Sequence, residues 1–529
     1  MSFIKFWQRL RDKASSEPGR PPGRDPALAR IKSGWLFDPD ASKYDLLTVL
    51  TYLACISTAN VNRMQLFEAA AKLNYGPSPY FAQVANLVQT LGYDFAHACH
   101  VVSQSAEDEV MRQFLLRLGN SLASGEPESV FLEREAFVQM ADYTNDYESD
   151  VASLSKWTDA FIALMVSTNL VVLVALISNM IYNLGSVLMI VTEGVVMLVA
   201  GMGAYLLYRI APFDPVIHKL KEKSQEQKLM SLLARILFPA SLLMALLVYF
   251  VSQSVGFAFL VAGLLVLPVG VVTHLLERKV DDRDRDIADF LRALGGVTAA
   301  RGSTVIDCLS HIDRRAIGSL EPELKRLLAR VAVGITTGRA WSRFMAETGS
   351  DLVHRVVRAF WDSIDLGGDP EKVGRFAADM ALKISLLRAK RRLVSSTFNY
   401  VIIPMHIALV GTLVFISEVV SAFNTKLVEA QAIVGGENAS TLRPEDIGIP
   451  SALAFQQFDT GFIKLMVLTV ILALTAVNAF APRAAAGGHN FKLALFGALT
   501  LCATGAILLL VPPLAGNMFS ETLRGQPTS

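Results

Sequence analysis

The chain has 529 residues, of which 52% are hydrophobic and 18% are charged, and its mean hydropathy is +0.40. This composition excludes an ordinary soluble protein, because the apolar residues gather in runs of about 20, the length that crosses a hydrocarbon core. The net charge of +1 indicates no partner by itself, and we expect no nucleic acid partner. Four scattered cysteines without a Cys-x-x-Cys pair exclude a disulfide scaffold and argue against zinc.

Residues 1–42 are predicted to form an amphipathic helix followed by a flexible linker. The first 13 residues place Phe3, Phe6, Trp7 and Leu10 at helical spacing among basic residues. Such a helix lies on a membrane surface or docks on a partner helix; the alternative is a frayed tail. Residues 15–33 are rich in Pro, Gly and Arg, and they contain too little apolar surface to fold.

The rest of the chain alternates helical and apolar segments and contains no strand-like alternation. We therefore expect an all-α, polytopic membrane protein with about seven spans and two repeated helical-bundle domains. The expected units are a helical domain at 43–158, four transmembrane helices at 159–276, a second helical domain at 277–397, and three transmembrane helices at 398–529 with an extracytoplasmic loop at 421–460. The apolar runs are 160–182, 186–208, 236–251, 255–276, 398–420, 462–480 and 493–514.

Positive charges predict the orientation of these spans. Five basic residues lie in 209–228, between the second and third runs, and Arg483 and Lys492 lie between the sixth and seventh. Residues 421–460 are acidic by contrast. Because basic loops are retained inside the cell, we predict a multi-pass protein of the cytoplasmic membrane. Its N terminus and both helical domains are expected to be cytoplasmic.

The two helical domains differ in charge. Residues 43–158 hold 7 basic and 14 acidic residues, a net charge of −7, whereas 277–397 hold 22 basic and 17 acidic residues, a net charge of +5. Opposite charges favour docking of the two domains on each other or the binding of distinct partners. The remaining alternative is that the surface charges of helical domains vary by chance and that neither net charge contributes to binding.

One short pattern occurs in both domains. Gly125 follows Ser124 and precedes Phe131 by six positions; Gly338 follows Thr337 and precedes Phe344 by the same interval. We expect these glycines to end a helix or to permit close helix approach. The two phenylalanines are expected to anchor the following helix in the core.

The sequence shows none of the common catalytic motifs. The chain contains no phosphate-binding loop with its lysine, no His-Glu-x-x-His and no Gly-x-Ser-x-Gly, so we expect no enzyme, no cofactor and no metal. His97, Cys99 and His100 do not all share one helical face. The alternating run Asp282–Asp286 lacks the glycine and glutamate of a calcium loop, and it predicts a solvated, self-paired helix start.

A few polar residues fall within or between the predicted spans. Glu193 lies inside the second span, where a carboxylate either serves function, such as lining a path for a substrate helix, or makes a structural hydrogen bond between helices. His406 and Glu418 in the fifth span are weaker cases. Asn438 begins the sequon Asn438-Ala439-Ser440 in the outer loop and is a possible glycosylation site.

Taken together, the module resembles the type II secretion system protein F family. The resemblance rests on Ser121–Gly125, on Phe131-Leu132-Glu133, on the approach from Tyr143 to Tyr147 into a span, and on a second copy at 290–376 that continues into Phe398. With two modules and additional spans, the chain is most similar to the membrane platform proteins of archaella and archaeal type IV pili.

The resemblance implies a non-enzymatic platform protein of a type IV filament or a type II secretion machine. Its partners would be a cytoplasmic hexameric ATPase, pilin- or archaellin-like subunits, the lipid bilayer and a second copy in a homodimer. Arg388, Lys390, Arg391 and Arg392 would contact the ATPase or act as positive-inside anchors, and we favour the anchor. The alternative function is a polytopic transporter or channel with cytoplasmic regulatory domains; a signalling scaffold is a third possibility.

Overall fold

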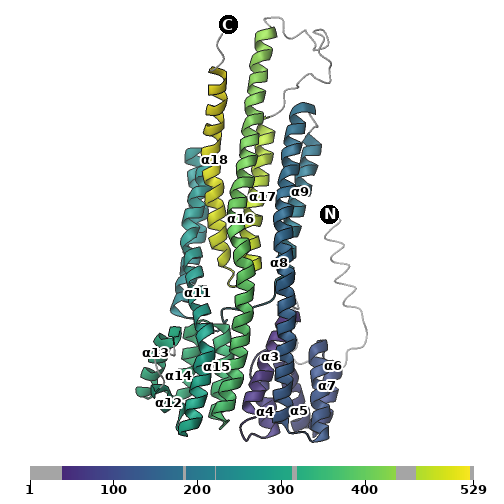
Figure 1. The fold of residues 1–529 in the computed structure, drawn as a ribbon, viewed down its shortest axis with the longest axis vertical. Helices are drawn as coiled ribbons and strands as arrows, with labels where there is room; N and C mark the ends of the chain where they lie inside the picture. The colour runs from purple at the N-terminus through teal and green to yellow at the C-terminus, as the bar shows by residue number, and fades with distance from the viewer. Residues whose placement is uncertain (1–38, 183–185, 221, 312–317, 436–459, 525–529) are drawn as a thin grey trace.

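The structure is a computed structural model that describes residues 39–182, 186–220, 222–311, 318–435 and 460–524. These residues form an all-α molecule whose only β-type pairing is an isolated bridge between Ile217 and Ser350. Two sets of helices lie side by side at one end, and long helices extend from them toward the other end (Figure 1). The predicted amphipathic segment at 1–13 and Asn438 both lie outside the described residues.

The first set of helices occupies the predicted N-terminal domain. Its members are α3 (Pro39–Ile56), α4 (Arg63–Ala71), α5 (Ser78–Leu91), α6 (Phe95–Ser105), α7 (Glu109–Ser124) and α8 (Glu128–Tyr182). Side chains define where several of them begin: Asn62 forms a capping box with Gln65 at the start of α4, and Asp94 and Asp108 cap α6 and α7. Each cap satisfies a backbone N–H that has no partner within the helix.

The second set follows the same order of helices. Its members are α11 (Val255–Arg301), α12 (Val305–His311), α13 (Glu321–Ala332), α14 (Thr337–Thr348), α15 (Asp351–Asp365) and α16 (Pro370–Gly435), with a short 3-10 turn at Gly318–Leu320. In this order α15 and α16 correspond to α7 and α8. The matching turns are Gly125-Glu126-Pro127-Glu128 and Gly368-Asp369-Pro370-Glu371, each of which starts a long helix.

The predicted equivalence of Gly125 and Gly338 is therefore wrong. Gly125 does end α7, with a left-handed φ of 74°. Gly338 lies in the first turn of α14, and a Cβ added there would meet nothing closer than Trp361 at 4.0 Å, so it neither ends a helix nor permits a close approach. Phe131 and Phe344 are both buried in the core, as predicted.

The two sets share one hydrophobic core. A single cluster of buried side chains runs from α3–α8 into α11–α16. Arg355 of α15 crosses the boundary and donates hydrogen bonds of 2.8 Å to both Asp45 and Thr48 of α3. Its guanidinium also lies 4.3 Å from the ring centroid of Tyr44. Docking of the two domains on each other is thus what the fold adopts, and we call the result the extramembrane bundle.

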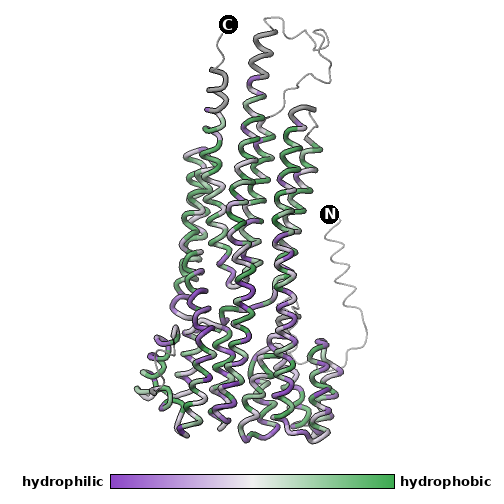
Figure 2. The backbone as a smooth tube through the Cα atoms, viewed as in Figure 1, coloured by the Kyte–Doolittle hydropathy of each residue, from purple (hydrophilic) through white to green (hydrophobic). Residues whose placement is uncertain are grey.

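Among the described residues, seven helices are long and apolar enough to cross a membrane. They are α8, α11 and α16 together with α9 (Ser186–Ile210), α10 (Gln225–Ser252), α17 (Thr460–Ala486) and α18 (Lys492–Arg524). Figure 2 shows that apolar residues dominate these helices where they extend beyond the extramembrane bundle, whereas polar residues are mixed into the bundle itself. The seven predicted spans all fall in these helices, so the chain is a polytopic membrane protein.

Three of the spans are continuous with the extramembrane bundle. The expected domain borders near 158, 276 and 397 lie inside α8, α11 and α16, where the structure has no interruption. The outer loop expected from residue 421 also begins later, because α16 remains helical to Gly435. Apolar periodicity marks where lipid begins, but it does not mark where a helix ends.

Glycines set the close packing of α11 against α18. A Cβ at Gly270 would lie 2.4 Å from the Cα of Leu495, and one at Gly263 would lie 2.9 Å from the carbonyl oxygen of Ala498. In the same way, a Cβ at Gly505 of α18 would lie 2.7 Å from the carbonyl oxygen of Gly256 of α11. Small residues let two spans approach closely where the hydrophobic effect does not drive association.

Replacing the two motif glycines by alanine should separate their roles. Gly125→Ala should destabilise the protein by about 1 kcal/mol, because a left-handed φ is unfavourable for a residue with a Cβ. Gly338→Ala should be neutral or stabilise by up to about 1 kcal/mol, because alanine is the better helix former. Thermal unfolding of the detergent-solubilised protein measures both; an equal loss from both variants would contradict the assignment.

Candidate functional site

A group of buried polar contacts lies where the extramembrane bundle meets the spans. Two short connections turn back toward the bundle there: residues 211–220, after α9, and residues 487–491, between α17 and α18. Both contact α11 and α16. We call these two connections, with the arginines of α16 that hold them, the junction.

Arg388 of α16 is the centre of the junction. Its side chain is only 3% exposed, and it pairs with Asp214 of the first connection at 2.7 Å and with Asp284 of α11. It also donates a 3.1 Å hydrogen bond to the carbonyl oxygen of Pro215, and Ser350 donates to the other carboxylate oxygen of Asp284. A planar guanidinium suits this arrangement because its N–H groups diverge toward several acceptors.

Arg391 lies almost one turn further along α16 and is equally enclosed. It donates to the carbonyl oxygens of Pro212 at 2.8 Å, Ala485 at 3.0 Å and Ala484 at 3.3 Å. The last two carbonyls belong to the final turn of α17, where the helix provides no N–H partner. Arg391 thus joins the end of one span to the connection between two others.

Glu277 of α11 holds the second connection. It accepts a hydrogen bond of 2.7 Å from the backbone N–H of His489 and pairs with Lys492 at 2.8 Å. Gly488 has a φ of +86°, and a Cβ there would lie 2.2 Å from a Glu277 oxygen, so glycine is required. The turn is therefore built around the carboxylate.

The first connection pairs with the turn between α14 and α15. The N–H of His218 donates to Gly349 at 3.2 Å, and the N–H of Asp351 donates to Val216 at 3.1 Å. His218 Nε2 also lies 2.8 Å from the carbonyl oxygen of Ala346. Residues 211–220 are consequently bound to α14, α15 and α16, all of which belong to the second helical domain.

These contacts change the interpretation of the basic cluster in α16. Arg388 and Arg391 are buried at 3% and 4% exposure, so neither side chain is available to a separate ATPase, and that prediction is wrong for them. Their role as positive-inside anchors stays a prediction. Lys390 is half-exposed and pairs with Glu148 of α8, and Arg392 pairs with Asp281 of α11. For these two, contact with an ATPase stays a prediction.

The prediction for the acidic run in α11 also needs correction. Asp282–Asp286 lies in the middle of α11, not at a helix start. Arg285 does pair with Asp282 at the surface, but Asp284 is 2% exposed. A helical spacing of four residues places Asp284 with Val280 and Ala288, both buried, and this spacing is the signal that could have revealed it.

Intramembrane polar residues make contacts between helices. Glu193 of α9 accepts a hydrogen bond from the hydroxyl of Thr469 of α17, which is the structural alternative. His406 of α16 is fully buried; its Nε2 lies 2.9 Å from Thr504 of α18 and its Nδ1 lies 3.0 Å from the amide of Asn478 of α17. Three spans are joined at His406, more than the sequence indicated.

The described part of the chain contains no cluster of three or more His, Cys, Asp or Glu side chains suited to a metal. What the junction does physically is to hold helices and connections in one arrangement.

Two known archaeal proteins are similar to this chain. The chain is 26% identical over 326 residues to "Flagella accessory protein J" of Methanocaldococcus jannaschii, an alignment that covers 58% of this chain and 56% of that protein. It is 21% identical over 442 residues to the protein of the same name from Methanococcus voltae, covering 82% and 77%. The chain is similar to archaeal flagella accessory proteins.

Other comparisons find no match. No protein-family model matches the chain, and no solved structure matches it. The resemblance to the type II secretion system protein F family therefore stays a prediction.

Removing the charge at the centre of the junction should be strongly destabilising. Arg388→Met should lower the free energy of unfolding by about 3–5 kcal/mol, because it leaves the carboxylates of Asp214 and Asp284 buried without a positively charged partner. Lys390→Met, on the exposed side of the same helix, should change it by less than about 1 kcal/mol. Denaturation of the purified protein checks both. Equal stabilities for the two variants would rule out a central role for Arg388.

Acid should weaken the extramembrane bundle through its buried histidines. Burial lowers the pKa of His354 from 6.5 to about 4, assisted by Arg358 and His218, and burial also lowers the pKa of His218. The unfolded chain then binds more protons than the folded chain between pH 6.5 and 4. Stability should be complete above pH 6.5 and fall by about 3 kcal/mol toward pH 4 on account of His354.

The measurement is the unfolding temperature as a function of pH. His354→Gln should flatten the decline, whereas His97→Gln, at an exposed position of α6, should leave it unchanged. If the His354 variant keeps the full decline, the assignment to this residue is wrong.

Proposed function

We propose that this chain is the membrane platform protein of an archaellum or a related type IV filament. In this proposal it couples a cytoplasmic hexameric ATPase to the assembly of pilin-like or archaellin-like subunits, and it performs no chemistry itself. The extramembrane bundle would then be cytoplasmic. A homodimer within the cytoplasmic membrane is part of the same proposal.

One structural observation carries most of the weight. The extramembrane bundle is connected to the spans by α8, α11 and α16 without a linker, and the junction fixes their relative positions. A motor that acts on the bundle would therefore move the spans with it, because helices in a packed core shift as rigid units. The likeness to two flagella accessory proteins supports a filament system rather than another membrane machine.

The transporter or channel alternative has less support. A transport path needs polar groups that face an aqueous route or a substrate near the middle of the membrane. Glu193 and His406, the polar residues considered for that role, are instead engaged with Thr469 and with Asn478 and Thr504 of neighbouring helices. These contacts favour a helix-packing role for both.

Filament assembly in cells that carry variant chains tests the proposal. Arg388→Lys keeps a charge but cannot reach Asp214 and Asp284 together as a guanidinium does, so we expect a chain that inserts in the membrane and yet assembles filaments at least roughly tenfold less well. Lys390→Arg is the matched control and should assemble normally. Filament yield by electron microscopy is the readout, with the membrane level of each chain measured in parallel.

Association with the motor is the second readout. The solubilised chain should retain the ATPase of its filament system on an affinity column. A chain that binds no such ATPase, and that instead moves solutes across proteoliposome membranes, would refute the platform role.

A further inference from the structure

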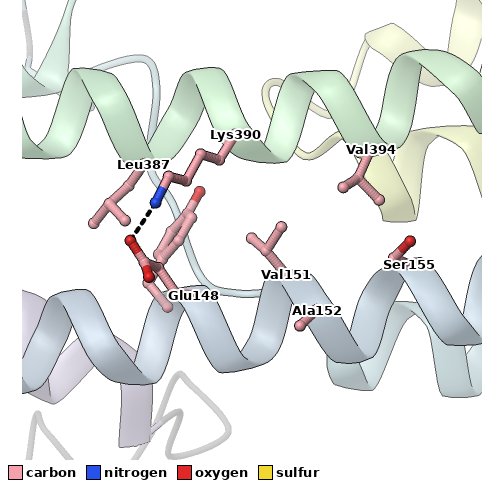
Figure 3. A pocket seen from close by; sticks show the side chains of 8 residues that line it. Glu148, Val151, Ala152, Ser155, Leu387, Lys390 and Val394 are labelled. Atoms are coloured by element: carbon pink, nitrogen blue, oxygen red, sulfur yellow. Dashed lines mark hydrogen bonds and ion pairs between the residues drawn. The ribbon is translucent and has the colours of Figure 1, made fainter.

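A shallow groove runs between α8 and α16 just outside the spans (Figure 3). Its lining is mainly apolar and includes Val151 and Ala152 from α8 and Leu387 and Val394 from α16. Lys390 reaches across it from α16 to Glu148 (Figure 3). The volume is about 260 Å³, below the usual size of a small-molecule pocket, so the groove suits protein side chains better than a soluble ligand.

The rims of the groove add apolar surface and negative charge. Leu386 and Leu393 of α16 are 51% and 72% exposed. The α8 stretch Asp142–Asp159 holds five acidic residues and one basic residue, and two of the acids, Asp146 and Glu148, already pair with Lys43 and Lys390. The stretch stays net negative with both lysines counted, so an occupant should present several large apolar side chains together with positive charge.

The beginning of the described chain lies close to this groove. Helix α3 begins at Pro39, and in its second turn Lys43 pairs with Asp146 of α8 at 2.6 Å. Asp146 precedes the groove residues Glu148 and Val151 by less than two turns. The described chain thus begins beside the groove, and the 25 residues from 14 to 38 can span at most about 90 Å when extended.

We propose that residues 3–13 of this chain occupy the groove between α8 and α16. Phe3, Phe6, Trp7 and Leu10 would cover its apolar lining, and Lys5, Arg9, Arg11 and Lys13 would face the acidic rim of α8. Covalent attachment makes the association intramolecular, so even a weak contact is well populated at the millimolar effective concentration of a short tether. The segment ties α8 to α16 at the level where both enter the membrane.

Disulfide trapping in the full-length protein tests this contact. Trp7→Cys is combined with Ala152→Cys in the groove, and the control combines Trp7→Cys with Ala123→Cys, an exposed position on α7. Under mild oxidation the groove pair should form an intrachain disulfide at least roughly tenfold faster than the control pair, because only the docked segment holds the two thiols together. Trp7→Cys alone reports any reaction with the native cysteines.

Each other result overturns the proposal in an identifiable way. Equal rates for the two pairs mean that the segment does not select the groove. Disulfides between chains, seen with two differently tagged copies, assign the groove to a second copy. Shielding of the thiol introduced by Trp7→Cys that depends on anionic lipid in nanodiscs, with no disulfide to position 152, places the segment on the membrane surface.

A deletion provides a measurement that does not depend on cross-linking geometry. Removing residues 2–13 should raise the rate at which a maleimide labels Ala152→Cys by roughly tenfold, if the segment covers the groove nine-tenths of the time. Labelling of Ala123→Cys should not change. An unchanged rate at position 152 would show that the groove is uncovered in the intact chain.

Discussion

Arg388 is held between Asp214 and Asp284 in a region that is almost fully buried, and the arrangement of the molecule depends on that triad. Its members come from α16, from the connection after α9 and from α11, segments far apart in the sequence. Burying three charges is unfavourable unless each finds its partners. The three buried charges therefore restrict how these segments can be placed relative to one another.

The triad and the shared core act at different levels. Burial of apolar side chains across α3–α8 and α11–α16 makes the extramembrane bundle one unit, and Arg355 fixes how its halves meet. The junction then fixes that unit to the spans. Hydrogen bonds from Arg391 to the end of α17, and from the backbone before α18 to Glu277, fix these two spans as well. The result is a membrane domain whose described connections on one side are attached to the bundle.

Apolar runs predicted the seven spans correctly, because the thickness of a bilayer imposes a length that is visible in any sequence. Local patterns were less informative where long-range contacts decide the structure. Asp284 was assigned to a solvated surface because its partner Arg388 is 104 positions away in the chain.

The predicted ATPase contact of Arg388 and Arg391 is wrong for the same reason, because long-range partners bury both side chains. Composition cannot distinguish an arginine that faces lipid headgroups from one that is enclosed by carbonyl oxygens, as Arg391 is. The sequence repeat was aligned on the wrong glycine, because Gly338 has the same kinds of neighbouring residues as Gly125 but lacks its left-handed conformation. The Gly-Glu-Pro-Glu and Gly-Asp-Pro-Glu turns are the better signal, since each lies between the end of one helix and the start of the long helix that follows.

The platform role proposed above needs the extramembrane bundle and the spans to move together, and this requires a rigid junction. Hydrogen–deuterium exchange of the intact protein in nanodiscs measures this directly. We expect the amides of residues 280–291 in α11 and 384–395 in α16 to be as protected as the core of the extramembrane bundle, and to open with it as one cooperative unit. Fast, independent exchange in these stretches would reveal a hinge at the junction and would contradict the account.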